Sequence, residues 1–106
     1  DDLYIWSGND DCTIPLMSLG ALGVISVASN IVPGAVAKLC ALCLEGSYAE
    51  ATELYAKYAS LFSALFIETN PIPVKDSGIL RLPLTEISQE SFETLLKAMR
   101  DAGINV

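Results

Sequence analysis

The sequence predicts an α/β fold in residues 1–46 and an α-helical region in residues 47–106. Two short runs of aromatic and β-branched residues, at 3–6 and 23–27, have the composition of β-strands. Each run is followed by apolar residues at helical spacing, and the remaining chain shows helical spacing broken by proline-containing connectors. A strand–helix–strand–helix order is typical of a parallel sheet covered by helices.

The first predicted strand, Leu3–Trp6, ends at the turn-forming pair Ser7-Gly8. The polar residues Asn9–Asp11 then offer side-chain oxygens as N-caps for a helix through residues 15–17. Gly20 is expected to end that helix, because glycine commonly follows the last helical turn.

The second predicted strand, Gly23–Val27, leads into a longer helix. Asn30 is a candidate cap for this helix, and Pro33 fits its first turn, where the missing N–H of proline has no partner to lose. The helix is expected to end at Gly46.

The second half contains two predicted helices and no strand. Ser47–Glu50 has the pattern of a capping box at the start of a long helix. Pro71 and Pro73 prevent that helix from continuing, and a second connector carries Pro83. Ser88 is the expected N-cap of the last helix. The residues predicted to face the core are Ala51, Leu54, Tyr55, Tyr58, Leu61, Phe62, Leu65 and Phe66 in the long helix, and Phe92, Leu95, Leu96 and Met99 in the last.

Charge and composition exclude several classes of function. The net charge is −7 and the few basic residues are scattered, so the chain does not predict a partner with a phosphate backbone. The absence of histidine removes serine–histidine nucleophile chemistry. The apolar stretch 14–44 is interrupted by glycine, asparagine and proline, so its pieces are too short for a membrane span of about 20 residues. No signal-peptide pattern begins at Asp1.

Three cysteines, Cys12, Cys40 and Cys43, do not suggest a disulfide framework, and they favour a reducing compartment. The Cys40-x-x-Cys43 spacing invites a zinc or redox interpretation, but zinc needs a second ligand pair. Because the pair lies in an alanine- and leucine-rich helical run, we expect both thiols to act as small apolar core residues.

Two parallel strands are too few for a complete sheet, since parallel strands occur almost only in larger sheets covered on both faces. A (β/α)8 TIM barrel needs about 250 residues. We therefore expect residues 1–46 to be the last two βα units of such a barrel, with the other strands preceding Asp1, and residues 47–106 to be a C-terminal helical extension. The alternative is a self-contained helical domain in which the two runs are buried loops.

Candidate site residues follow from the strand ends, where barrel enzymes place their functional groups. Gly8 would let a small substrate approach the backbone, or would simply serve a tight turn. Asp10 and Asp11 fit either acid–base chemistry or helix capping. Lys38 and Lys75 do not lie at a strand end, so no catalytic nucleophile is expected in this chain.

Four segments carry a resemblance to a known family. Tyr4–Asp10 and Gly23–Asn30 resemble the seventh and eighth strands, with their loops, of the dihydrodipicolinate synthase family. Glu68–Lys75 and Leu80–Leu84 resemble the connectors of its C-terminal helical extension. The four segments occur in the family's order, and the resemblance as a whole extends over essentially the whole chain.

This resemblance implies a class I aldolase-type lyase that condenses pyruvate with aspartate semialdehyde through a lysine Schiff base, in lysine and diaminopimelate biosynthesis. The Schiff-base lysine would precede Asp1, so the segment alone would be inactive. No cofactor and no metal are expected. Gly8 and Ile25 would line the pyruvate pocket, with Asn9 and Asp10 at its rim; Asn9 stands where the family often has aspartate. A cytoplasmic homotetramer is implied.

The chain departs from the family between Lys75 and Arg81, where family members carry a further helical segment. Two other functions stay open. One is a different pyruvate-dependent lyase of the same superfamily, similar to N-acetylneuraminate lyase. The other is a non-catalytic, truncated assembly module that docks through exposed apolar faces.

Overall fold

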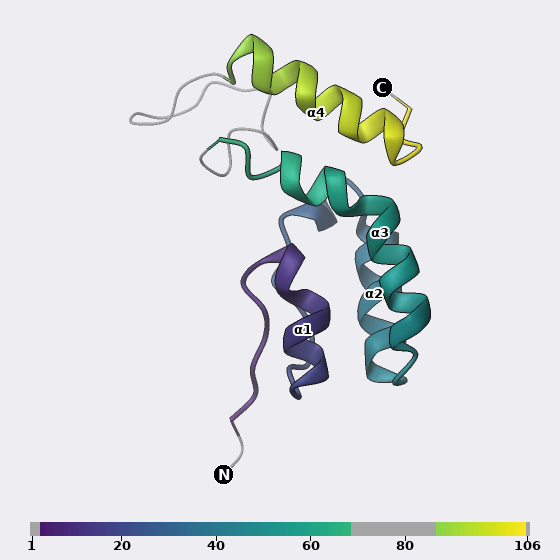
Figure 1. Ribbon diagram of the computed structural model, residues 1–106. Coiled ribbons are helices and arrows are strands. Elements are labelled where there is room, and N and C mark those ends of the chain that lie inside the picture. Colours follow the sequence, from purple (N-terminus) through teal and green to yellow (C-terminus); the bar gives the residue numbers. More distant parts are fainter. Residues whose placement is uncertain (1–2, 69–86, 106) are drawn as a thin grey trace. The chain divides into compact units, whose positions relative to one another are not determined.

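The computed structural model describes residues 3–68 and 87–105, and these are mainly helical (Figure 1). The chain divides into two compact units, Asp1–Lys57 and Tyr58–Val106. Within the described residues, no helix has both the length and the apolar character needed to cross a membrane. The helices are the short 3-10 turns η1 (Asp10–Cys12) and η2 (Ala28–Asn30), and the α-helices α1 (Thr13–Ser18), α2 (Pro33–Leu44), α3 (Tyr48–Ala64) and α4 (Gln89–Asp101).

The two predicted strands, Leu3–Trp6 and Gly23–Val27, do not form in the described part of the chain. Instead Ser7, the residue after the first segment, forms one isolated parallel bridge with Val24 of the second. The second segment cannot extend the pairing, because the backbone N–H groups of Val27 and Ala28 donate to the Asp10 side chain instead. The parallel direction was predicted correctly, but the length of the pairing was not.

The helix ends agree with the sequence in most cases. Gly20, Gly46 and Gly103 follow α1, α2 and α4 with φ angles of 104°, 80° and 80°, a region that glycine enters without steric strain. Pro33 occupies the first turn of α2, as expected. Ser88 caps α4, because its side chain accepts a hydrogen bond from the Ser91 N–H at 3.2 Å.

The predicted N-caps of the first two α-helices were wrong. Cys12 is the N-cap residue of α1, and it makes no side-chain capping bond. Asn30 does not cap α2 either, because its side-chain amide donates to the Val27 carbonyl at 2.9 Å. Residues with good capping chemistry therefore lie near both helix starts and bind other groups.

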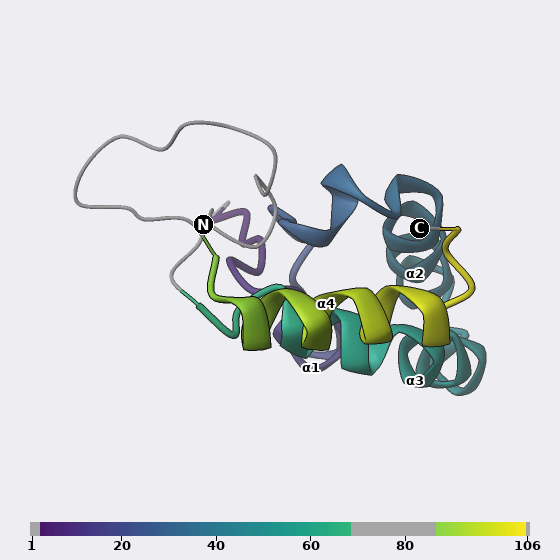
Figure 2. The same ribbon diagram turned by 90° about the horizontal axis from the view of Figure 1, so that it is seen from above.

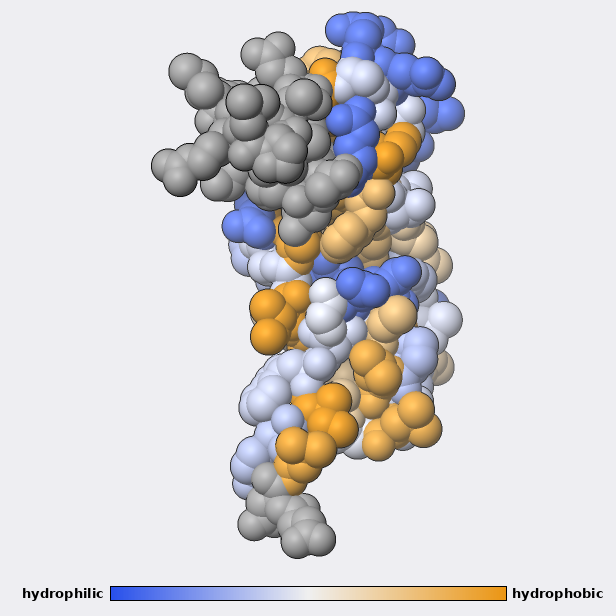
Figure 3. Space-filling view, turned by 90° about the vertical axis from the view of Figure 1, so that its left-hand side faces the viewer, coloured by the Kyte–Doolittle hydropathy of each residue, from blue (hydrophilic) through white to orange (hydrophobic). Residues whose placement is uncertain are grey.

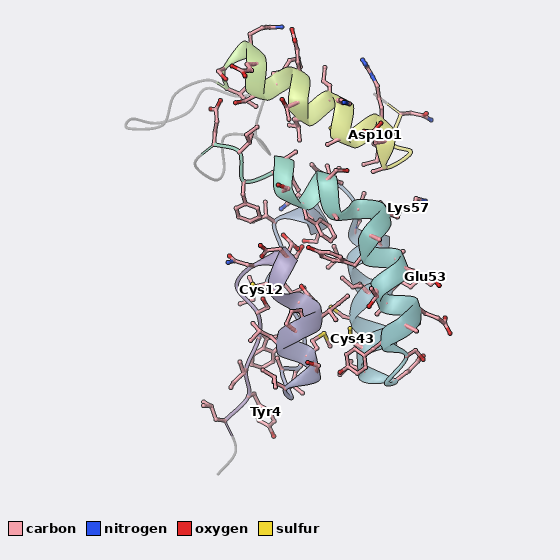
Figure 4. The ribbon with its side chains drawn as sticks, viewed as in Figure 1. Tyr4, Cys12, Cys43, Glu53, Lys57 and Asp101 are labelled. Atoms are coloured by element: carbon pink, nitrogen blue, oxygen red, sulfur yellow. The ribbon has the colours of Figure 1, made fainter. Side chains whose placement is uncertain are left out.

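The core of the first unit forms where α1 contacts α2. Met17 from α1 and Val36, Leu39 and Cys43 from α2 are all buried. Figure 4 labels Cys43, which is 4% exposed, and burial raises the pKa of its thiol. Cys43 is thus the apolar core residue that was predicted, whereas Cys40 is only partly buried.

The second unit contains the end of α3 and all of α4. Leu61, Phe62 and Leu65 are buried on one side of α3, in agreement with the predicted apolar stripe, although Phe66 is 42% exposed. On α4, Leu95 is buried as predicted, while Phe92, Leu96 and Met99 are only partly buried. The connectors between residues 69 and 86, including the prolines at 71, 73 and 83, lie outside the described residues.

Glu68 is expected to titrate below the usual glutamate range. Its carboxylate accepts hydrogen bonds from the Ser91 side chain and from the Ser88 N–H, the latter at 3.0 Å, and these bonds lower its pKa. A folded pKa below the unfolded value means that this contact stabilises the fold fully above the unfolded pKa. The stabilisation is lost as the pH falls through the lowered folded pKa.

An NMR titration of the Glu68 carboxyl carbon should give a midpoint below about 4.3, the ordinary value. Ser91→Ala should raise that midpoint, because the Ser91 bond is the largest cause of the shift. Ser60→Ala, at an exposed position of α3, should leave it unchanged. A Glu68 midpoint that ignores Ser91→Ala would contradict this account.

Candidate functional site

The candidate site begins at the seam between the two extended segments. Three backbone hydrogen bonds form it: Leu22 N–H to the Ile5 carbonyl at 2.8 Å, Ser7 N–H to the Gly23 carbonyl at 2.8 Å, and Ile25 N–H to the Ser7 carbonyl at 2.9 Å. The last bond brings Ile25 beside the start of the Ser7–Asp10 turn. The turn residue Gly8 and Ile25, which are 17 positions apart in sequence, therefore become neighbours.

Ser7 shapes the turn that carries Gly8 and Asn9. Its side chain is fully buried, and its hydroxyl donates to the Asn9 carbonyl at 2.7 Å and accepts from the Asn9 N–H at 3.2 Å. Serine hydroxyls commonly stabilise turns in this local manner. Both Gly8 and Asn9 remain exposed, and nothing lies within 4 Å of the position that a Cβ of Gly8 would occupy.

Asp10 makes the densest polar contacts of the site. Its side chain is 2% exposed, yet one carboxylate oxygen accepts from the Ser26 hydroxyl and the other from the N–H groups of Val27 and Ala28, both at 3.0 Å. A buried carboxylate is costly unless such donors surround it, and bonds to a charged acceptor are the strong ones. Among the described residues, no buried side-chain nitrogen or oxygen lacks a partner.

Ser26 extends the Asp10 contacts into η2. Its hydroxyl also accepts from the Ser29 N–H at 2.8 Å, and the Ser29 hydroxyl donates back to the Ser26 carbonyl at 2.9 Å. The side chain of Asp10 thus binds the start of η2 rather than the start of α1. This explains why Asp10 does not cap the helix that follows it in sequence.

The four predicted binding residues separate into two groups. Gly8, Asn9 and Ile25 are exposed at the surface, Ile25 to 75%. Asp10 is enclosed behind them. Large apolar side chains continue the surface beside the seam, and Leu3, Tyr4, Ile5 and Trp6 are each at least half exposed. In Figure 3 apolar residues appear in orange on the surface of this part of the chain.

The described residues offer few other reactive groups. They contain no cluster of three or more histidine, cysteine, aspartate or glutamate residues suited to a metal ion. Lys38 lies exposed on α2, and Lys75 lies outside the described residues. The Asp11 side chain is hydrogen-bonded to the Cys12 thiol, and this bond raises the pKa of Cys12.

A small hollow includes Asp11 in its lining. It has a volume of about 230 Å³ and is lined by Asp11, Ile14, Pro15, Thr52 and Tyr55. Burial raises the pKa of the Tyr55 hydroxyl, with a further contribution from the Asp11 charge. The hollow includes none of Gly8, Asn9 and Ile25, so it is separate from the candidate site.

Sequence reasoning missed Ser7 and Ser26 as members of the site. A serine–glycine pair at the end of an extended run is a recognised turn signal, so the role of Ser7 could have been found. The role of Ser26 could not, because its Asp10 partner is 16 positions away and lies outside any local motif.

Comparison with known proteins gives consistent results. The model of the dihydrodipicolinate synthetase family matches residues 1–102. A 4-hydroxy-tetrahydrodipicolinate synthase from Persephonella marina is 46% identical over 112 residues, covering 97% of this chain and 38% of the relative. The crystal structure of dihydrodipicolinate synthase from Aquifex aeolicus has a TM-score of 0.93 and 41% identity, covering 98% of this chain and 38% of that one.

A third comparison concerns a structure with a small molecule bound. The chloride-inhibited dihydrodipicolinate synthase from Acinetobacter baumannii, complexed with pyruvate, has a TM-score of 0.91 and 42% identity, covering 97% of this chain and 38% of that one. This chain therefore spans well under half of the length of these relatives. Figure 2 shows the helices of this matching segment in a second view. The alignment with the Persephonella protein, at 112 residues, exceeds the 106 residues of this chain, so that relative has residues here that this chain lacks.

Proposed function

The chain belongs to the dihydrodipicolinate synthetase family, which has the TIM-barrel fold, and from this we propose that it acts as part of a 4-hydroxy-tetrahydrodipicolinate synthase. Residues 1–46 would supply the last two βα units of the barrel, and residues 47–106 its C-terminal helical extension. The single observation that carries the proposal is the combined agreement of sequence and fold over nearly the whole chain.

The proposed reaction condenses pyruvate with aspartate semialdehyde, in lysine and diaminopimelate biosynthesis. A lysine amine outside this segment would attack the keto carbon of pyruvate and expel water, giving a Schiff base. Loss of a methyl proton would convert the Schiff base to an enamine, and the enamine carbon would then attack the aldehyde. The pyruvate complex of the Acinetobacter relative supports pyruvate as the first substrate.

In this proposal Gly8 and Ile25 line the pyruvate pocket, and Asn9 lies at its rim. The seam bond from Ile25 N–H to the Ser7 carbonyl supports this placement, because it brings both turn and apolar side chain to one surface. Gly8 leaves its surroundings open, which suits a small planar acid approaching the backbone. An apolar side chain beside the methyl group of pyruvate would exclude water from the reacting carbon.

The proposal also includes a cytoplasmic location and assembly as a homotetramer. The many exposed apolar side chains of the described residues support association with further protein surface, because large apolar patches commonly mark interfaces. Sedimentation analysis of the assembled enzyme should give the mass of four chains.

A chimera tests the activity. These 106 residues would replace the matching segment of the Persephonella marina synthase, and the protein would be treated with pyruvate and sodium borohydride. Borohydride delivers hydride to the imine carbon and fixes pyruvate to the lysine as a secondary amine. We expect one pyruvate adduct, on a lysine contributed by the Persephonella part, and turnover with aspartate semialdehyde.

Two controls make the result decisive. An adduct on Lys38 would contradict the proposed division of roles, and so would an adduct on this chain without the Persephonella part. Turnover with N-acetylmannosamine in place of aspartate semialdehyde would instead favour a lyase similar to N-acetylneuraminate lyase. A folded chimera that forms no adduct at all would overturn the proposed function.

A further inference from the structure

We infer that Asp10 is a positioning residue for the pyruvate pocket, which it serves by holding the turn that follows Ile25. This inference rests on the proposed function, and it differs from the rim contact expected of Asp10 from the sequence. At 2% exposure, the side chain of Asp10 is enclosed by its own turn and by residues 26–28. It therefore acts on the pocket through its neighbours.

The bonds of Asp10 all reach the residues directly after Ile25. Its carboxylate accepts from the Ser26 hydroxyl and from the N–H groups of Val27 and Ala28. The three donors occupy both carboxylate oxygens, so the side chain cannot rotate without breaking at least one bond. The backbone from residue 26 to residue 28 is thereby fixed to the Asp10 side chain.

Ile25 is held on its other side by Ser7. The Ser7 N–H donates to the Gly23 carbonyl, and the Ser7 carbonyl accepts from the Ile25 N–H at 2.9 Å. Ser7 and Asp10 are the first and last residues of one four-residue turn, and that turn also carries Gly8 and Asn9. The same short turn consequently places Gly8 and Ile25 and fixes the distance between them.

A carboxylate suits this task better than its nearest replacements. Asparagine offers one acceptor oxygen where aspartate offers two, so its amide N–H₂ would face either the Ser26 hydroxyl or the two backbone donors. Alanine would leave the donors of Val27 and Ala28 buried without a partner. We therefore expect Asp10→Ala to disturb these contacts more than Asp10→Asn. Ser26→Ala removes one donor to Asp10 and also the acceptor of the Ser29 N–H.

The test measures steady-state kinetics of the chimera described above. Asp10→Ala should raise the KM for pyruvate about tenfold. Displacing a pocket group by about 1 Å can cost on the order of a hundredfold. We expect a smaller effect here because the Ser7 seam still holds Ile25. Asp10→Asn should give a smaller rise, and the KM for aspartate semialdehyde should change less than about twofold. Glu45→Gln is the matched control, because the exposed Glu45 follows α2 and makes none of these bonds.

The outcomes separate the inference from the function on which it rests. If Asp10→Ala and Asp10→Asn lower the melting temperature but leave the KM for pyruvate unchanged, Asp10 is only structural and the inference is wrong. Should Asp10→Ala fail to fold, Asp10→Asn and Ser26→Ala still test the inference, because each must raise the KM for pyruvate. An unmodified chimera without a pyruvate adduct would overturn the proposed function, and the inference with it.

Discussion

Ile25→Asp is expected to reduce kcat/KM for pyruvate by about a hundredfold or more in the assembled enzyme. The substituted carboxylate would lie beside the methyl group, in the same small pocket as the carboxylate of pyruvate. Two like charges about 4 Å apart repel by about 4 kcal/mol at an effective dielectric constant of about 20. Such a repulsion corresponds to about a thousandfold in affinity. Salt and water near an open pocket reduce it, hence the lower figure.

Leu19→Asp is the matched control for this measurement. Leu19 is 84% exposed and follows α1, and it takes no part in the seam, so its carboxylate variant should keep kcat/KM within about twofold. Ile25→Val should also stay close to the unmodified enzyme, because it retains an apolar branched side chain. If Ile25→Asp behaved like Leu19→Asp, Ile25 would not line the pyruvate pocket.

Leu61→Ala should destabilise the unit that contains α4 by about 2–5 kcal/mol, the usual range for deleting a fully buried leucine side chain. Leu61 is 0% exposed, so the shortened side chain would leave a cavity in the core. Hydrogen exchange should show the loss as faster opening of the amides of α4 and of the last turns of α3.

Ile67→Ala serves as the comparison. Ile67 is 44% exposed and lies just beyond α3, so truncating it should change the opening free energy by no more than about 0.5 kcal/mol. Equal effects of Leu61→Ala and Ile67→Ala would mean that Leu61 does not anchor this unit. A large change confined to amides before Tyr48 would contradict the division into two units.

Helix ends were predictable because their signals are local. Pro33 and Gly46 enclose α2, and Ser88 caps α4, each through backbone properties of the residue itself. Hydrophobic spacing likewise identified the buried residues Leu61 and Leu95. Such features depend on neighbours within one or two helical turns, which the sequence displays directly.

The contacts of Asp10 were predicted less well because they are not local. Asp10 looked like a cap for the adjacent helix, and local chemistry alone supports that interpretation. Its actual donors are 16 to 18 positions later in the chain, where no motif announces them. The same bonds shortened the second predicted strand, because they divert the N–H groups of Val27 and Ala28. One misassigned side chain therefore accounts for two errors.

The seam between the extended segments has a consequence for production of the protein. Its hydrogen bonds use the Ile5 carbonyl and the N–H and carbonyl of Ser7. In an extended segment, the backbone N–H and carbonyl groups of alternate residues point to opposite sides. Tyr4 and Trp6 therefore turn their amides outward, beside side chains that are 64% and 50% exposed. An unpaired edge of this kind is a template for pairing with another extended chain. Overproduction of this segment by itself should give inclusion bodies, whereas synthesis as part of the chimera should give material that stays in the supernatant.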